Sequence, residues 1–131
     1  MKYRLTLVIT TAALCCLTLS GCITGSAKIP SEDLDVLKLY RQEIAVLHSE
    51  LPPNSEGKYR AAKKLLDNVD FTYTRSVETL DDIFSSRDAR VDAPSAANQM
   101  IMFYYQYKDQ SVRFVFYRYN NMITRVETYE K

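Results

Sequence analysis

Residues 112–121 read VRFVFYRYNN, and this stretch decides the fold class. Val112, Phe114 and Phe116 stand at every second position. Because side chains alternate between the two faces of a strand, this spacing predicts a strand with one apolar face. The Asn120-Asn121 pair that follows is typical of a two-residue hairpin turn, since Asn tolerates the left-handed conformation of a type I′ turn. The stretch therefore predicts a strand over 112–119 that turns back into a second strand over 122–129.

An aromatic segment, 100–107, precedes this hairpin and predicts another strand, joined to it by a turn at 108–111. The three strands form an antiparallel β-meander. Such a sheet needs another layer to cover its apolar face. Both faces of 100–107 are apolar, so a homodimer that buries the second face is one possibility.

Three predicted helices supply the covering layer. The first begins at Ser31, a good N-cap, and ends at Pro52-Pro53. Its apolar residues recur at steps of three and four and form one stripe, Leu34, Leu37, Tyr40, Ile44, Leu47 and Leu51. A core-facing stripe is the simplest interpretation, and a short coiled coil with a partner helix is the alternative.

The second and third predicted helices also have one apolar side. The second, 56–68, has an apolar side formed by Tyr59, Ala62, Leu66 and Val69. Its basic residues are expected on a solvated face, namely Lys58, Arg60, Lys63 and Lys64. The third follows its cap Ser76 and buries Val77, Leu80, Ile83 and Phe84. Residues 88–98, with Pro94, predict a loop. The expected fold is a two-layer α+β domain of three N-terminal helices packed on a three-stranded antiparallel β-meander.

The N-terminus has the layout of a secretory signal. Lys2 and Arg4 precede an apolar run over 5–19, and small residues follow. The run is short for a membrane span of roughly 20 residues. Leu19-Ser20-Gly21-Cys22 reads as a lipobox, which predicts cleavage between Gly21 and Cys22. We expect a signal peptide at 1–21, a lipidated tether at 22–30 and one domain at 31–131. An uncleaved anchor helix and a signal peptide cut elsewhere are the alternatives.

This segment resembles a bacterial lipoprotein signal. The resemblance implies that Cys22 carries acyl chains such as palmitate, and that two or more chains hold the protein stably on a membrane. Ile23, rather than Asp, follows the cysteine. In a bacterium with two membranes this implies the outer membrane, on its periplasmic side. With Cys15 and Cys16 removed and Cys22 acylated, the mature chain keeps no free thiol.

Charge argues against nucleic acid as a partner. The whole chain has 17 basic and 16 acidic residues, and the predicted mature chain loses Lys2 and Arg4, which leaves 15 against 16 and a formal charge of −1. Such a balance gives no electrostatic reason to bind a phosphate backbone.

Chemistry-bearing residues do not form a recognisable catalytic pattern. His48 is the single histidine, and alone it can make neither a metal site nor a triad. Asp81 and Asp82 are neighbours on a predicted helix and point about 100° apart. Gly57 is the only glycine beyond the tether, so a phosphate-binding loop is absent from the sequence. We therefore expect no enzyme activity, no metal site and no cofactor.

The C-terminal half resembles the SmpA/OmlA (BamE-like) family of small outer-membrane lipoproteins. The residues that carry the resemblance are a capped helix and the aromatic strands that follow it, namely Ser76, Leu80, Ile83, Phe84, Phe103, Tyr105, Tyr107, Val112, Phe114, Phe116 and Val126. It covers roughly 74–130, with Thr74-Arg75 and Ser85-Ser86-Arg87 in place of the family's Gly-Met and Gly-x-Pro. The resemblance implies a non-catalytic part in outer-membrane protein assembly.

The face of the sheet opposite Val112 is the candidate binding surface. If that residue points inward, five Tyr and Arg residues face outward on two neighbouring strands, Arg113, Tyr117, Tyr119, Arg125 and Tyr129. Ile123 falls on the same face in this register. Tyr and Arg are enriched at the energetic centres of protein interfaces, although Tyr is also common on ordinary solvated sheets.

These observations favour a lipid-anchored envelope protein that acts as an adaptor or scaffold for another protein. The alternative is a ligand-binding or enzyme-inhibitor module. A concave pocket lined by Tyr104, Tyr105 and Tyr107 would favour that alternative.

Overall fold

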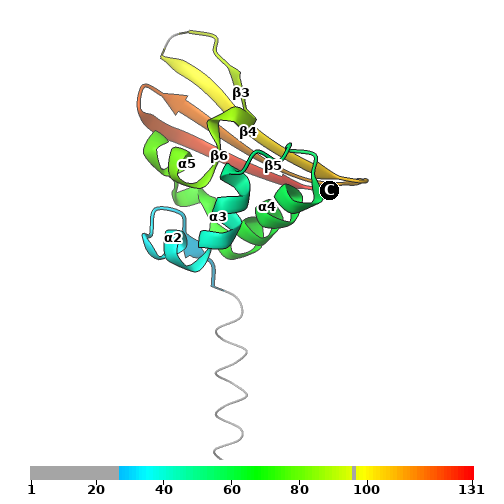
Figure 1. Ribbon diagram of the computed structural model, residues 1–131. Coiled ribbons are helices and arrows are strands. Elements are labelled where there is room, and N and C mark those ends of the chain that lie inside the picture. Colours follow the sequence, from blue (N-terminus) through cyan, green and yellow to red (C-terminus); the bar gives the residue numbers. More distant parts are fainter. Residues whose placement is uncertain (1–26, 96) are drawn as a thin grey trace, which may run out of the picture.

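The structure is a computed structural model that describes residues 27–95 and 97–131. Its centre is an antiparallel sheet of four strands in the order β3 (Ala89–Asp92), β4 (Asn98–Tyr107), β5 (Gln110–Tyr119) and β6 (Met122–Glu130). Each strand pairs with its neighbour in the chain, which makes a continuous meander (Figure 1). The α+β class and the antiparallel meander predicted from the sequence are confirmed.

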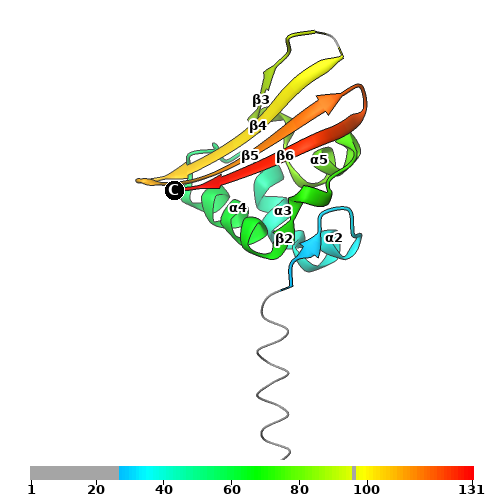
Figure 2. The same cartoon turned by 180° about the vertical axis from the view of Figure 1, so that it is seen from behind.

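Helices cover one face of this sheet. They are α2 (Asp35–Leu39), α3 (Arg41–His48), α4 (Glu56–Asn68) and α5 (Val77–Ile83), with 3₁₀ turns η1 (Phe71–Tyr73) and η2 (Ser86–Asp88). Both views show the helices on the same side of the sheet and the other side open (Figures 1 and 2). A two-stranded parallel pair, β1 (Ile29–Pro30) with β2 (Val69–Asp70), closes the helical layer near the point where the chain enters the domain.

Side-chain caps set two of the helix starts, and the second of them, at Ser76, was predicted from the sequence. The Ser55 hydroxyl accepts a hydrogen bond from the Lys58 backbone N–H and begins α4. The Ser76 hydroxyl accepts from the Thr79 backbone N–H and begins α5. Each cap satisfies a backbone donor that the first helical turn leaves unpaired.

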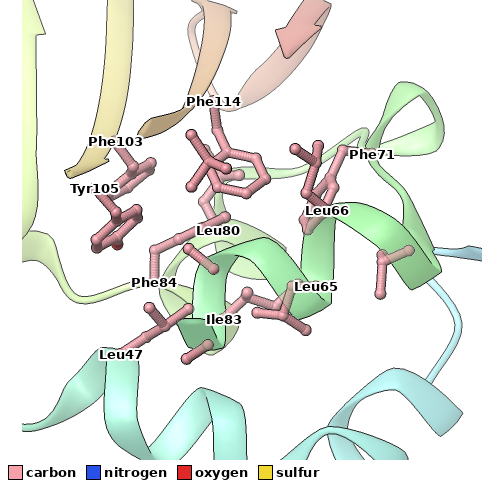
Figure 3. Close-up of a cluster of buried hydrophobic side chains, with 14 of the residues drawn as sticks. Leu47, Leu65, Leu66, Phe71, Leu80, Ile83, Phe84, Phe103, Tyr105 and Phe114 are labelled. Atoms are coloured by element: carbon pink, nitrogen blue, oxygen red, sulfur yellow. The ribbon is translucent and has the colours of Figure 1, made fainter. Parts of the chain in front are cut away.

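Aromatic rings fill the space between the layers (Figure 3). Phe84, which follows α5, stacks on Phe103 of β4 with ring centroids 4.4 Å apart and an interplanar angle of 14°. Phe71 of η1 meets Phe114 of β5 edge-on at 5.1 Å. Val112, Phe114 and Phe116 are fully buried, so the predicted inward face of β5 is confirmed. Pairs of this kind stabilise a core beyond the area that they bury.

The prediction of three strands was wrong, because β3 lies where the sequence predicted a loop. Ala89 pairs with Phe103 and Asp92 with Met100, so β3 extends the sheet by one edge strand. Three of its four residues are exposed, which removes the apolar alternation that would have identified a strand. A four-residue strand at an edge needs little burial, because its neighbour supplies the backbone partners.

The first predicted helix was also wrong in its extent. It begins at Asp35 without a side-chain cap, and Ser31, predicted as that cap, bonds instead to the Thr74 hydroxyl. It breaks at Tyr40, whose φ of −113° and ψ of 27° are not helical, and α3 ends at His48. Leu34 and Leu51 of the predicted stripe are 75% and 46% exposed, whereas Leu47 is fully buried. Val36, which lies off the stripe, is buried instead, because the break at Tyr40 changes which side of α2 faces the core.

Lys58 was expected on a solvated face, but it is only 1% exposed. Its amine lies 2.6 Å from Asp88 Oδ2 and donates a hydrogen bond to it. A buried ammonium requires such a partner, because burial without one costs several kcal/mol. Burial and the neighbouring charge of Asp88 raise the pKa of the Tyr105 hydroxyl above its ordinary value.

The predicted signal peptide, the cleavage site at Gly21 and the acylated Cys22 lie outside the described residues. Ile29 and Pro30, placed at the end of the tether, pair with Val69 and Asp70 as β1. The folded part therefore begins slightly earlier than the sequence indicated. Across 27–95 and 97–131 there is no helix whose length and apolar character would let it cross a membrane.

Candidate functional site

The open side of the sheet, called the outer face here, is built by strand alternation and register. Its residues pair across the strands and point away from the helices: Arg90, Asp92, Met100, Met102, Tyr104, Gln106, Ser111, Arg113, Val115, Tyr117, Arg125, Glu127 and Tyr129. Among the described elements, all helices lie on the opposite side (Figure 2).

A first cluster on this face joins Tyr117, Arg125 and Glu127. Tyr117 and Arg125 are direct cross-strand partners, and the Arg125 guanidinium carbon lies 4.1 Å from the centroid of the Tyr117 ring. The Tyr117 hydroxyl donates a hydrogen bond of 2.8 Å to Glu127 Oε1, and Arg125 Nη2 lies 3.5 Å from the same oxygen. The hydrogen bond from Tyr117 and the nearby charge of Arg125 lower the pKa of Glu127. The contacts with Tyr117 and Glu127 raise the pKa of Arg125.

A second pair repeats this arrangement along the same two strands. The Arg113 guanidinium carbon lies 4.2 Å from the centroid of the Tyr129 ring, its cross-strand partner on β6. On its other side, Arg113 pairs with Tyr104 of β4. Arg113 Nε is buried and has no hydrogen-bond partner within the described part of the chain. The Arg113 guanidinium gains cation–π attraction from the Tyr129 ring.

The centre of the outer face is apolar. Val115 lies between the two Arg–Tyr clusters and is only 4% exposed, although it points away from the helices. Met102, its partner on β4, is half-buried. Arginine side chains can lay their methylene groups over apolar neighbours while the charged ends stay in water. The surface therefore has an apolar centre with a planar, charged rim, which is the usual composition of a protein interface.

Three shallow depressions border this face. The largest of the three encloses about 460 Å³ between the β3–β4 connection and the β5–β6 end, and Arg118 and Arg125 line it beside Asp92 and Tyr117. The other two enclose about 240 Å³ beside Arg113 and Tyr129 and about 270 Å³ beside Arg90 and Gln106. The pocket that would favour a ligand-binding module, lined by Tyr104, Tyr105 and Tyr107, does not form. Tyr105 is fully buried on the inner face of β4, whereas Tyr104 lies on the outer face.

Four of the five predicted surface residues come together here, namely Arg113, Tyr117, Arg125 and Tyr129. Tyr119 is 53% exposed but lies at the turn, apart from the two clusters. Ile123, expected on this face, is 4% exposed and belongs to the core. The turn pairs Ile123 with Arg118, on the side of the sheet that carries Phe116. The register shift between Tyr117 and Arg118 is a bulge, and it places Arg125, Glu127 and Tyr129 on the outer face instead.

The sequence prediction missed the contribution of β3 to the surface. Arg90 lies with its guanidinium carbon 6.0 Å from the Tyr104 ring, which adds a third Arg–Tyr pair. The alternation of Met100, Met102 and Tyr104 could have placed the β4 residues. No pattern in 89–92 identified the strand that carries Arg90.

The described residues bring together no group of three His, Cys, Asp or Glu side chains. His48 lies on the surface with Nε2 3.2 Å from the Asp82 backbone oxygen, and Asp81 and Asp82 are exposed. No protein family model matches this chain, and no curated protein or solved structure is significantly similar to it.

Proposed function

We propose that this protein is a non-catalytic, lipid-anchored adaptor of the bacterial cell envelope that docks a protein partner on the outer face of its sheet. The observation that carries the proposal is the outer face itself. Three Arg–Tyr pairs surround an apolar centre at Val115 on the side of the sheet that the helices leave open.

The clusters on the outer face are organised before any partner arrives. The guanidinium groups of Arg125 and Arg113 lie against the rings of Tyr117 and Tyr129, with 4.1 Å and 4.2 Å between the guanidinium carbon and the ring centroid. Ordering such long side chains during binding costs about 0.5–1.5 kcal/mol each. A surface on which they are already ordered loses less of that free energy, so it suits a binding role better than a sheet with mobile lysines.

The position of the chain entry supports the same role. The chain enters the domain at β1, on the helical side and away from the sheet (Figures 1 and 2). An anchor at Cys22 would hold the helical side toward the membrane. The outer face would then point into the periplasm, where another envelope protein can reach it.

The resemblance to the SmpA/OmlA family suggests where the partner belongs. It rests on residues of α5, β4, β5 and β6, such as Leu80, Phe103, Phe114 and Val126. On this basis we place the partner within an outer-membrane protein assembly machine.

A second candidate, a module that binds a small anionic ligand, is favoured by one observation. The largest of the three depressions, of about 460 Å³, lies within the usual size range of ligand pockets and contains Arg118 and Arg125. Arg125 already has a carboxylate partner in Glu127. This occupancy makes the protein-docking function the better-supported proposal.

The test is a crosslinking pull-down from native membranes with the lipidated chain. Three forms are compared, namely the wild-type chain, the Cys22→Ala variant and the double variant Tyr117→Ala with Arg125→Ala. We expect a defined envelope protein with the wild-type chain and its loss with either variant. Equal capture by the double variant would contradict docking on the outer face, and recovery of only a second copy would replace the adaptor with a homodimer.

A further inference from the structure

Three large apolar side chains are exposed at the end of the domain where the chain enters it. Leu34 precedes α2 and is 75% exposed, Leu39 ends α2 and is 63% exposed, and Tyr73 of η1 is 52% exposed. We call these three residues the entry surface. Single exposed leucines are common, but Leu34 and Leu39 lie on either side of Val36, the residue that α2 turns inward to the core, so packing does not explain their exposure.

Hydrogen bonds hold the parts of the entry surface side by side. The Ser31 and Thr74 hydroxyls are 2.6 Å apart in a buried position. Glu32 Oε1 accepts a hydrogen bond from the Ser76 backbone N–H at 3.1 Å, and Glu32 Oε2 accepts one from the Thr79 hydroxyl at 2.6 Å. The segment before α2 is therefore fixed against the segment that contains Tyr73. The entry surface belongs to a rigid part of the fold.

The predicted anchor lies close to this surface along the chain. β1 begins at Ile29, only seven residues after Cys22. An extended chain spans at most about 3.5 Å per residue, so seven residues reach about 25 Å. If Cys22 is acylated, the end of the domain that carries α2 cannot move farther than this from the bilayer (Figure 1).

We propose that the entry surface rests on the lipid bilayer, with Leu34 and Leu39 inserted at the boundary between head groups and acyl chains. This inference rests on the proposed function, because it requires the anchor at Cys22. The contact turns a flexible attachment into a fixed orientation. Tyr73 suits the same boundary, where aromatic side chains with a polar end are enriched.

Charge indicates that the contact is apolar. Lys28, Lys38 and Arg41 are balanced by Glu32, Asp33 and Asp35 on the same end of the domain. Such a mixture gives no preference for anionic lipid, since attraction to an anionic leaflet needs an excess of cations. Two leucines are also too few to bind without the acyl chains, because one myristoyl chain alone binds only marginally.

The test uses the full lipidated chain in phosphatidylcholine vesicles. An environment-sensitive fluorophore is attached in the Lys38→Cys variant, which leaves both leucines in place. The matched control is the Ser95→Cys variant, labelled in the β3–β4 connection at the other end of the molecule (Figure 1). Acylation of Cys22 leaves the introduced thiol as the only site for the label.

We expect nitroxide-bearing lipids to quench most of the fluorescence at position 38 and little at position 95. Replacing both leucines, Leu34→Ser with Leu39→Ser, should remove the quenching at position 38 while the protein still floats with the vesicles. Equal quenching at the two labelled positions, or quenching that persists in the serine variant, would overturn the inference. Quenching that requires phosphatidylglycerol would also overturn it.

Flotation separates the two proposals. A wild-type chain that does not float with the vesicles lacks the anchor, and the proposed function fails with it. A chain that floats but shows no quenching at position 38 keeps its anchor and refutes only the bilayer contact at the entry surface.

Discussion

The guanidinium of Arg125 lies over the ring of Tyr117 with 4.1 Å between its central carbon and the ring centroid. The two residues are direct partners on β6 and β5, and Glu127 holds both through its Oε1 atom. The Arg125 side chain is 62% exposed, so its ion pair with Glu127 contributes little to stability. The three side chains contact one another on the face of the sheet that the helices do not cover.

The first prediction concerns this cluster. The double variant Tyr117→Ala with Arg125→Ala should lower partner affinity by about 30-fold or more, since even one residue at the centre of an interface can contribute about 2 kcal/mol or more. Its free energy of unfolding should fall by only about 1 kcal/mol, because the pair is exposed. Binding is measured with the isolated partner, and unfolding by urea denaturation.

Thr128→Ala is the matched control for this prediction. Thr128 is exposed on the same strand but alternates to the other side from Arg125. The control should leave affinity unchanged. A loss of affinity equal to that of the double variant would mean that the β6 strand as a whole, and not the outer face, supports binding.

The second prediction separates two leucines of the same predicted stripe. Leu47→Ala should lower the free energy of unfolding by about 2–5 kcal/mol, because Leu47 is fully buried. Leu34→Ala should change it by less than about 0.5 kcal/mol, because Leu34 is 75% exposed. Urea denaturation of the unacylated Cys22→Ala form measures both. Similar losses of unfolding free energy in the two variants would mean that both leucines are buried, as the uninterrupted first helix required.

The third prediction concerns the buried ion pair between Lys58 and Asp88. Asp88→Ala should lower the free energy of unfolding by about 3–5 kcal/mol, because it leaves the Lys58 ammonium buried without its partner. Replacing both residues, Lys58→Met with Asp88→Leu, should cost less than Asp88→Ala alone, since no buried charge remains.

Lys63→Met provides the control for an exposed pair. Lys63 contacts Asp67 and Glu130 on the surface, so its loss should cost less than about 1 kcal/mol. If Asp88→Ala cost no more than Lys63→Met, the ammonium of Lys58 would have to reach water, contrary to its burial.

The fourth prediction concerns the pH dependence of stability. Burial raises the pKa of Glu32, but hydrogen bonds from Thr79, Arg75 and Ser76 outweigh it and leave the pKa below the ordinary value of 4.5. A carboxylate whose pKa falls on folding stabilises the protein above its unfolded-state pKa and loses this effect as the pH drops through the folded-state pKa. Glu32→Gln should therefore destabilise the protein at neutral pH by less than about 1 kcal/mol, because water screens the charge of an exposed carboxylate.

The difference between wild-type Glu32 and the Glu32→Gln variant should shrink as the pH falls below 4.5. Urea denaturation at a series of pH values measures it. A difference that stays constant down to acid pH would show that the shape of the Glu32 side chain, and not its charge, holds the segment before α5.

The sheet was predictable because its core strands alternate clearly. The inner face of β5 was predicted from the alternation of Val112, Phe114 and Phe116. The position of the next strand, β6, was predicted from the turn at Asn120. Asn120 has a positive φ of 53°, whereas Asn121 does not, so the turn is not the type I′ turn that the pair suggested. The four residues that form the two clusters of the outer face followed from the same alternation.

The remaining features depend on contacts that a sequence does not reveal. β3 is a strand only because β4 offers it a free edge. Ile123 and Arg125 lie on opposite sides of β6 because of a bulge whose position depends on pairing with β5. Lys58 can be buried because its ammonium forms an ion pair with Asp88, thirty residues later in the chain.

Site-specific photo-crosslinking in living cells tests the outer face most directly. A benzophenone amino acid replaces Tyr117 on the outer face or, as the control, Tyr40 between α2 and α3 on the helical side. The account predicts a discrete adduct with one envelope protein from position 117 and none from position 40. The reverse pattern, or no adduct from position 117 in a chain that reaches the membrane, would contradict the claim that this face docks a partner.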